Sequence, residues 1–499
     1  MKNFVKSVTI VTLFSVITRV LGFFFRIFLS RKLGAEGLGI FQIAASVIGI
    51  FLTLVSSGLP LTTAKFVSKY NSSNEFKRKN AVVTSTIVIG LVVSITTGTI
   101  IFALKGFWNI ILSEKRAVEI VIILVPSIVF SAIYAVFRGA LWGEGDYFAC
   151  GLTELFEQVV RFVLTVILLK NITDCFLSAK YSAVAFNLTC LMSAIFALIF
   201  HLKRGQFNFS KGEYKSVLKS ATPITGVRLA NSLVQPLTAM IIPFMLIVAG
   251  YSNGDATASY GVIMGMTMPL LYVPMTITGS ISMVLIPSIS ELLQKGEHEK
   301  IKNNILTCLN VTLFLSAIFV PLYISVGNKI GIVLYKNALS GTLLQLASIC
   351  LIPISMCNLT GSILNALNLE VKSFKNYFIG SSILIISLFV LTPALKISAV
   401  IVAYFISMSL ISILNIQKIN KTLGIDYHLW KETFKYTLII IPSSLIGTFV
   451  GNICGHLFGN FMSCVLGGGI SILFILILCQ IFKFFDIRKI VNLARKRTT

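Results

Sequence analysis

The sequence predicts an all-α protein that crosses a membrane many times, and three observations lead to this fold class. Hydrophobic residues make up 56% of the chain and charged residues only 12%, whereas soluble globular domains carry about 25% charged residues. The mean hydropathy is +0.90. Long apolar runs, each able to cross a hydrocarbon core of roughly 30 Å, recur along the whole chain. These properties exclude a soluble globular protein.

The apolar runs number about fourteen, and each is interpreted as one transmembrane helix of about 20 residues. Prolines and glycines interrupt several runs, which membrane helices tolerate when neighbouring groups satisfy the freed backbone carbonyls. The first run is too long for the apolar region of a signal peptide, so it is expected to remain as a span. The expected runs lie within residues 8–30, 38–62, 81–104, 117–137, 152–170, 181–202, 221–250, 258–288, 304–327, 341–366, 376–393, 397–417, 434–454 and 461–482.

Lysine and arginine are distributed unevenly among the segments that join these runs. Most of them lie on the same side as the N-terminus, and because cytoplasmic loops carry the excess of basic residues, both termini are predicted to be cytoplasmic. This distribution accounts for the net charge of +24 without a nucleic-acid partner. The nine cysteines and four histidines form no CxxC or HExxH pattern, so neither a disulfide framework nor a metal site is expected.

The chain also shows an internal repeat. The segment from Glu75 to Asn80 resembles the segment from Glu299 to Asn304, and FRGALWGEGDYF resembles SILNALNLEVKSF at nearly the same separation. Six helices in each half give both halves the same orientation, as in transporters built from parallel repeats. The predicted division is an N-lobe at 1–202, a cytoplasmic amphipathic linker at 203–220, a C-lobe at 221–420, and two further helices with a basic cytoplasmic tail at 421–499.

Three arginines lie inside the expected spans, where a charged side chain costs roughly 2.5–3.5 kcal/mol near the helix centre. Arg19 and Arg26 share one helix face because their spacing is close to two turns, and Arg228 begins the second half as they begin the first. Arginine stays protonated and can hold two phosphate oxygens, which favours an anion site. Alternatively, each arginine pairs with a carboxylate or extends to the interface. Further hydrogen-bonding candidates are Gln42, Asn231 and Gln235.

Acidic residues inside the spans are almost confined to the segment LTELFEQVVRFVL. Glu157 and Arg161 have the favourable order for a helical ion pair, and Glu154 shares their face. A structural ion pair is favoured over binding of a coupling ion by Glu154 or Glu157. Glu36 is expected to be a solvated turn residue in preference to a gate. The chain has no GxxxxGK[ST] motif, so ATP is not expected to be its direct energy source. The expected driving force is an ion gradient, the membrane potential or removal of the product.

Several segments of the sequence resemble the stage V sporulation protein B family. They are TRVLGFFFRIFLSRKLGAEGLGIFQ, SGLPLTTAKFVSKY, FRGALWGEGDYF with LFEQVVRF, TPITGVRLANSL, YGVIMGMTMPLLYVPMTITGSISMVLIPSISE and SILNALNLE. That family belongs to the multidrug/oligosaccharidyl-lipid/polysaccharide exporter superfamily, near the lipid II flippases. The resemblance covers about residues 5–420. It implies a V-shaped, two-lobed transporter of the bacterial plasma membrane with a pseudo-twofold arrangement.

The resemblance also implies a function. It is that of a flippase, which moves an undecaprenyl-pyrophosphate-linked peptidoglycan precursor, lipid II or a related lipid-linked oligosaccharide, to the outer leaflet by alternating access for spore cortex or cell-wall synthesis. In the related lipid II flippases, arginines of the first helix hold the substrate. Arg19 and Arg26 match that pattern, although the spacing in some of those flippases is one residue shorter, and Arg228 matches through its TGVR segment.

The same resemblance implies no catalytic residue and no cofactor, with Na⁺ or H⁺ as candidate coupling ions. The implied partners are the lipid-linked substrate, membrane lipids and cell-wall synthesis enzymes, and the implied oligomeric state is a monomer. The last two helices are implied to hold the polyprenyl tail in a groove. Plain helix packing is the favoured role of Gly447, Gly451 and Gly455, which recur on one face.

Two other functions remain open. A cation-coupled multidrug exporter of the same superfamily would favour acidic groups in its cavity, whereas the candidate residues here are basic. The second alternative is a membrane scaffold that recruits cell-wall enzymes without transporting anything. In such a scaffold, the three arginines inside the spans would have no role that offsets the free energy of placing them in the membrane.

Overall fold

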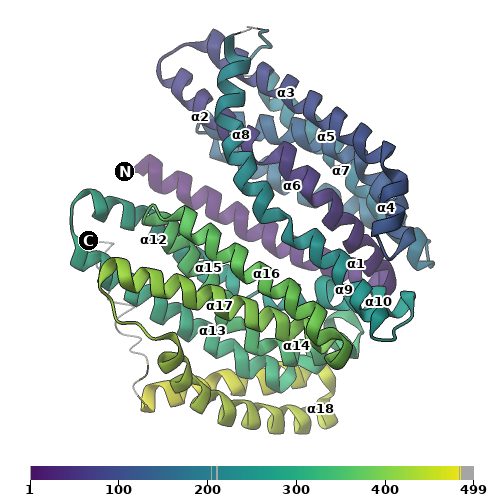
Figure 1. Ribbon diagram of the computed structural model, residues 1–499, viewed down its shortest axis with the longest axis vertical. Helices are drawn as coiled ribbons and strands as arrows, with labels where there is room; N and C mark the ends of the chain where they lie inside the picture. Colours follow the sequence, from purple (N-terminus) through teal and green to yellow (C-terminus); the bar gives the residue numbers. More distant parts are fainter. Residues whose placement is uncertain (1, 204, 210–211, 483, 485–499) are drawn as a thin grey trace. The chain divides into compact units, whose positions relative to one another are not determined.

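The computed structural model describes residues 2–203, 205–209, 212–482 and 484, and every regular element in them is helical. The predicted all-α class is therefore confirmed. The chain packs as two compact units, here called unit 1 (Met1–Gly261) and unit 2 (Val262–Thr499). Each unit is described by itself below, and Figure 1 labels the helices. The predicted basic tail at the C-terminal end lies outside the described residues.

Unit 1 begins with a long helix that contains two of the predicted runs. Gly34 separates them, because its φ of 67° and ψ of −176° are not helical, a conformation that glycine adopts at little cost. The helices of unit 1 are α1 (Lys2–Ser56), α2 (Gly58–Ser72), α3 (Phe76–Ala103), α4 (Lys105–Ile111), α5 (Lys115–Gly143), α6 (Tyr147–Leu169), α7 (Cys175–Leu202), α8 (Gly212–Ser232), α9 (Val234–Val248) and α10 (Asn253–Tyr260).

Unit 2 ends in a similar way, with a long helix that Gly459 interrupts at a φ of 82°. A π-helix, η1 (Gly261–Thr267), joins α10 to this unit. The remaining elements are α11 (Met268–Leu271), α12 (Met275–Gln294), α13 (His298–Tyr335), α14 (Ala338–Ala347), the short 3₁₀ helix η2 (Ser348–Cys350), α15 (Leu351–Ala366), α16 (Glu370–Leu395), α17 (Ser398–Leu423) and α18 (Leu429–Ile481).

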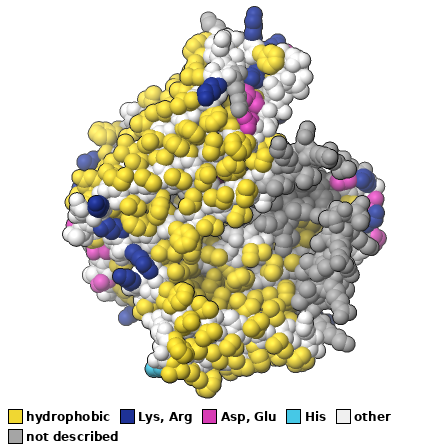
Figure 2. All heavy atoms as spheres, turned by 180° about the vertical axis from the view of Figure 1, so that it is seen from behind, with side chains coloured by type: hydrophobic (Ala, Val, Ile, Leu, Met, Phe, Trp, Pro, Cys, Tyr) yellow, Lys and Arg dark blue, Asp and Glu magenta, His cyan; other side chains and the backbone are white. Residues whose placement is uncertain are grey.

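Ten helical stretches among the described residues are long and apolar enough to cross a membrane, so the chain is a multi-pass membrane protein. Two of these stretches, Ile10–Ser72 and Leu429–Ile481, each cover two predicted runs. Helical segments overlap all of the predicted runs, although the number of crossings stays a prediction. Figure 2 shows hydrophobic side chains spread across much of the surface, with charged side chains gathered towards its margins.

Prolines explain why the seventh predicted span is two helices. Pro236 has no N–H with which to bond the carbonyl of Ser232, four residues earlier. The helix α8 ends at that residue, and α9 begins at Val234. The eighth predicted span is divided in the same way into α10, η1, α11 and α12, with Pro274 directly before α12.

The core of unit 1 joins α8 to the helices of the predicted N-lobe. Val217 and Ala221 of α8 are buried in one cluster with Val67 of α2, Val82 of α3 and Phe137 of α5. The packing boundary therefore lies at Gly261 instead of near the predicted linker. The four-part division by sequence stays a prediction, because a packing unit and a sequence repeat are different properties.

The two loop similarities fall at matching points of the two series of helices. Glu75 is the N-cap of α3, and Glu297, close to the similar segment, is the N-cap of α13. The second pair of segments spans the turn from α5 to α6 and the turn from α15 to α16. This placement supports the predicted internal repeat.

Glycines allow the backbones of several helices to touch, as is common in membrane proteins. A Cβ atom added to Gly139 of α5 would lie 2.4 Å from the carbonyl oxygen of Pro60 in α2. In unit 2, a Cβ atom at Gly447 would lie 2.6 Å from Cβ of Ser471, so the two halves of α18 pack on each other. The same helix face holds Gly451, whose carbonyl accepts a hydrogen bond from Ser463. Helix packing is thus confirmed as a role of these C-terminal glycines.

The closest crossing in unit 1 gives a stability prediction. A Cβ atom at Gly39 of α1 would lie 2.0 Å from the carbonyl oxygen of Thr257 in α10, and a backbone atom cannot rotate away. Since overpacking costs about 1–3 kcal/mol, Gly39→Ala should lower the thermal unfolding midpoint of the purified protein in detergent. Gly49→Ala is the matched control, because it lies on the same helix with no neighbouring atom within 4 Å. Equal midpoints for the two variants would contradict the crossing.

Candidate functional site

The candidate arginines Arg19 and Arg26 are both exposed on the part of α1 that precedes Gly34. Their spacing puts them on one face of that helix. Among the carboxylates in the part of the chain that the structure describes, none forms an ion pair with Arg19. A guanidinium on a helix this apolar needs water or a ligand around it. This segment can therefore offer positive charge to an anion.

The other candidate binding residues also lie in unit 1. Arg228, Asn231 and Gln235 are exposed around the break between α8 and α9, and Gln42 is half-buried in α1 after the bend. The helix α1 packs against both α8 and α9. Arg228, like Arg19, has no carboxylate partner among the described residues. The structure thus brings the elements that carry these candidates into contact within one packing unit.

The predicted acidic helix holds two ion pairs. Glu157 pairs with Arg161 on α6, as the spacing predicted, and the guanidinium of Arg161 lies 5.3 Å from the ring centroid of Phe186 in α7. Glu154 instead pairs with Arg138 of α5 at 3.1 Å. In each of these half-buried pairs, one glutamate neutralises one arginine. The pairs support a structural role for Glu154 and Glu157, and binding of a coupling ion by either residue stays a prediction.

Sequence reasoning missed the part played by Arg138. It lies near the end of α5, and Glu154 lies near the start of α6, with only a short turn between the two helices. Residues at similar distances from such a turn face each other in a helical hairpin. This spacing around the turn was the signal that could have found the pair.

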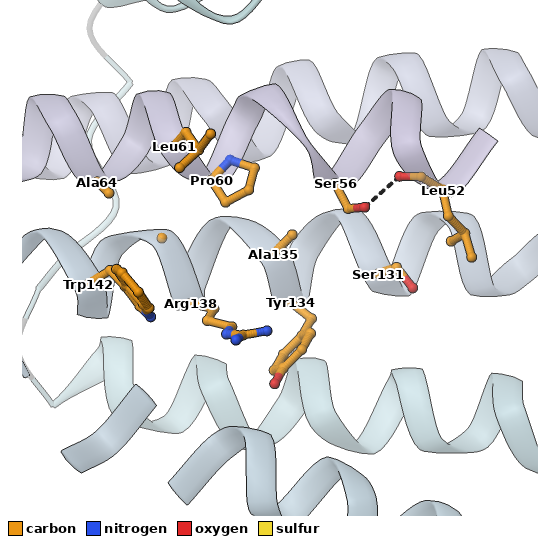
Figure 3. A pocket seen from close by; sticks show the side chains of 11 residues that line it. Leu52, Ser56, Pro60, Leu61, Ala64, Ser131, Tyr134, Ala135, Arg138 and Trp142 are labelled. Carbon is orange, nitrogen blue, oxygen red and sulfur yellow. Dashed lines mark hydrogen bonds between the residues drawn. The ribbon is translucent and has the colours of Figure 1, made fainter. Parts of the chain in front are cut away.

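A cavity of about 360 Å³ lies beside Arg138, between α5 and the segment formed by the end of α1 and the start of α2. Figure 3 shows Tyr134, Arg138 and Trp142 projecting from α5, with Pro60 and Leu61 on the neighbouring segment. Most of its wall is apolar, and its lining includes one cation and no carboxylate.

An ion network connects four helices where α5 begins. The Nη2 atom of Arg116 lies 2.6 Å from Glu36 of α1, and its Nε atom lies 2.8 Å from Glu114. The hydroxyl of Thr257 in α10 donates to Glu114 at 3.2 Å, and the thiol of Cys175 in α7 lies 3.8 Å from Glu36. The expectation that Glu36 is a solvated turn residue was therefore wrong. A sequence cannot reveal a partner eighty positions away.

The other end of unit 1 is held by buried polar contacts. Lys79 of α3 pairs with Glu144, the C-cap of α5, at 2.7 Å, and both side chains are largely buried. The hydroxyl of Tyr70 in α2 lies 3.4 Å from both carboxylate oxygens of Glu213 in α8. The first contact joins α3 to the end of α5, and the second fastens α8 to α2. No group of three or more potential metal ligands occurs among the described residues.

Solved structures show which class of protein has this fold. The lipid II flippase MurJ in an inward closed conformation matches with a TM-score of 0.69 and 16% identity, covering 95% of this chain and 99% of that chain. An inward-facing multidrug resistance MATE family transporter of the MOP superfamily matches with a TM-score of 0.66 and 16% identity, covering 81% and 94%. The fold is that of a multi-pass membrane transporter.

The chain belongs to the family described as polysaccharide biosynthesis protein, which it matches over residues 4–293. Stage V sporulation protein B of Bacillus subtilis is 26% identical over 456 residues, which are 88% of each chain. Lipid II flippase MurJ of Bacillus subtilis is 23% identical over 337 residues, which are 61% of each chain. The predicted family resemblance is confirmed. The family and the matching structures are membrane flippases and transporters and not enzymes, in agreement with the prediction.

The network at the start of α5 predicts a pH dependence. Burial raises the pKa of Glu114, but hydrogen bonds from Arg116 outweigh burial and hold the pKa below its usual value. A depressed folded-state pKa stabilises the protein above the unfolded-state pKa, and this stabilisation is lost as the pH falls through the folded-state pKa. The thermal midpoint of the wild type should therefore fall as the pH drops below about 4.3, the ordinary pKa of glutamate.

The variant Glu114→Gln should show a smaller loss over the same pH range. Glu299→Gln is the control, because Glu299 is exposed and pairs only with Lys302 of its own helix. A Glu114→Gln protein with the full acid dependence of the wild type would overturn this assignment.

The ion pair on α6 gives a second stability prediction. Removing one partner of a buried pair costs about 3–5 kcal/mol, and water access to these half-buried side chains reduces that cost. Glu157→Gln and Arg161→Gln should each lower the thermal midpoint, and the double variant should recover most of the loss. A double variant less stable than either single variant would show that the two side chains act separately.

Proposed function

We propose that this protein is a flippase that moves an undecaprenyl-pyrophosphate-linked peptidoglycan precursor, lipid II or a related lipid-linked oligosaccharide, from the inner to the outer leaflet. The family, the similarity to lipid II flippase MurJ and the transporter fold support this proposal. The similarity to stage V sporulation protein B supports a role in spore cortex or cell-wall synthesis. We place the protein in the bacterial plasma membrane, with both termini in the cytoplasm.

The observation that carries the proposal is the pair of exposed, carboxylate-free arginines, Arg19 and Arg228, on helices of unit 1 that pack together. A pyrophosphate is a compact anion with several acceptor oxygens. Guanidinium groups bind such oxygens in pairs and stay charged at any physiological pH. Arg26 extends the same helix face, and Gln42, Asn231 and Gln235 supply further donors around the headgroup.

Alternating access requires two bodies that can rearrange, and two compact units meet this requirement. The transporter acts as a monomer in this proposal, with membrane lipids around it and cell-wall enzymes using its product. An ion gradient of Na⁺ or H⁺ drives the cycle. Glu154 and Glu157 are the carboxylates within unit 1 that can take part, by exchanging an arginine partner for the ion.

The rival function is a cation-coupled multidrug exporter, which the similarity to a MATE transporter favours at the level of the fold. A cationic drug would be repelled by exposed arginines. The charge of the candidate site therefore favours the anionic lipid.

The test is the rate at which labelled lipid II exchanges between leaflets of vesicles that contain the purified protein. We expect the wild type to accelerate exchange and Arg19→Ala to reduce the rate about tenfold or more, since a hydrogen bond to a charged group contributes about 1.5–3 kcal/mol. Arg78→Ala is the matched control, because Arg78 is an exposed arginine of unit 1 that pairs with Glu75.

Exchange no faster than in protein-free vesicles would refute the flippase, and an unchanged rate in Arg19→Ala would refute the site. Dissipating the Na⁺ gradient and the H⁺ gradient separately identifies the coupling ion, and no effect from either would refute ion coupling.

A further inference from the structure

None of the candidate substrate residues lines the cavity beside Arg138, and the chemistry of its lining specifies a ligand. Its walls are apolar, formed by Leu52 of α1, by Pro60, Leu61 and Ala64, and by Ala135 of α5. Leu61 and Trp142 are about half exposed, so apolar surface continues from the cavity onto the outside of unit 1. A ligand for this cavity has an apolar portion.

The polar end of the cavity is positive. Among the described residues, the guanidinium of Arg138 contacts a carboxylate at one point, from Nη2 to Oε1 of Glu154 at 3.1 Å, and a guanidinium has five N–H donors. No carboxylate lines the cavity itself. Donors are therefore left over on the cavity side, and they suit an anionic acceptor that Arg138 would bridge to Glu154.

The neighbouring tyrosine contributes to the wall of the cavity. Tyr134 and Arg138 are one helical turn apart and project from the same face of α5 (Figure 3). The side chain of Tyr134 is nine-tenths buried, and its hydroxyl oxygen is enclosed in the helix bundle, so that oxygen is out of reach of a ligand in the cavity. Arg138 is therefore the cationic donor at the polar end of the cavity.

The cavity also lies at a depth that suits a lipid headgroup. Trp142 is the penultimate residue of α5, and the charged Glu144 and Asp146 follow directly. Tryptophan concentrates where hydrocarbon meets headgroups. An apolar wall that ends in an arginine and an interfacial tryptophan matches one acyl chain joined to one phosphate.

We propose that this cavity binds the phosphate end of an anionic glycerophospholipid of the surrounding membrane, with Arg138 as the donor and the acyl chain along the wall between α2 and α5. A single guanidinium that already contacts a carboxylate matches one monoanionic phosphodiester better than a pyrophosphate. The volume of about 360 Å³ is near the lower limit for ligand pockets, about 300–1,000 Å³, so the cavity holds the phosphate and the start of one acyl chain while the rest of the lipid lies outside it. The proposal does not depend on the flippase function.

The test uses Trp142 as a reporter of the bound lipid. The full-length protein is reconstituted into phosphatidylcholine vesicles that contain equal fractions of either brominated phosphatidylglycerol or brominated phosphatidylcholine. Bromine quenches only nearby tryptophans, and subtracting the signal of a Trp142→Phe variant isolates this residue from Trp108 and Trp430. We expect phosphatidylglycerol to quench Trp142 at least twofold more strongly than phosphatidylcholine.

Arg138→Gln should abolish this preference, and Arg78→Gln should preserve it. Because Arg138→Gln leaves Glu154 without its partner, the double variant Arg138→Gln/Glu154→Gln tests the same loss with both charges removed. Equal quenching by the two lipids, or an unchanged preference in the double variant, would overturn the proposal.

A final measurement distinguishes a structural lipid from the transported one. Undecaprenyl pyrophosphate added at a few per cent of the phosphatidylglycerol should leave the quenching unchanged. Displacement at that ratio would assign the cavity to the polyprenyl substrate and overturn the phospholipid. Loss of leaflet exchange in Arg19→Ala with intact quenching of Trp142 would separate this site from the proposed transport site.

Discussion

A charged side chain on an apolar membrane helix needs a partner of opposite charge, water or a ligand, and this constraint organises unit 1. Arg138 and Arg161 have glutamates within the helix bundle, and Arg116 and Lys79 have glutamates near its two ends. Arg19 and Arg228 have no such partner among the described residues. The paired cations hold helices together, and the exposed Arg19 and Arg228 can serve a ligand without first giving up a carboxylate partner.

Backbone contacts at glycines determine where these side chains can lie. At Gly139 the helices α2 and α5 approach to the point where a Cβ atom would overlap the carbonyl of Pro60. Arg138 directly precedes Gly139, and its side chain therefore lies beside this crossing of α2 and α5. The cavity opens on that side, with Arg138 and Trp142 along it. The close contact of Gly139 with Pro60 thus determines where the side chain of Arg138 lies in the cavity.

Sequence reasoning succeeded where the controlling interaction is local. The apolar runs follow from the hydrocarbon thickness, and the Glu157–Arg161 pair follows from one helical turn. It failed for Glu36, because the partner, Arg116, belongs to a different helix. It also failed to associate Arg138 with Glu154. Helical periodicity tells which residues share a face, but it does not tell which neighbouring helix that face meets.

The same limit explains the difference between the repeat and the packing, and it matters for transport. By sequence, α8 begins the second half, yet Val217 and Ala221 are buried in the core of unit 1, and Glu213 contacts Tyr70. A motion that preserves this core carries Arg19 and Arg228 together, so in the proposed transport cycle they contribute to the same side of the proposed binding site.

In the proposed transport cycle, the change of access then arises beyond α10. There, Gly261 packs against the backbone of Ala35 and Gly39, and the chain continues directly into the π-helix η1. Turns of π-helix are rare in proteins, and many of those that occur lie at functional sites. After η1, Pro269 and Pro274 each lack the N–H group that would donate a helical hydrogen bond. For the proposed alternating access, the segment from Gly261 to Pro274 is a better position for a hinge than the linker at 203–220, because α8, which follows that linker, is fastened to unit 1.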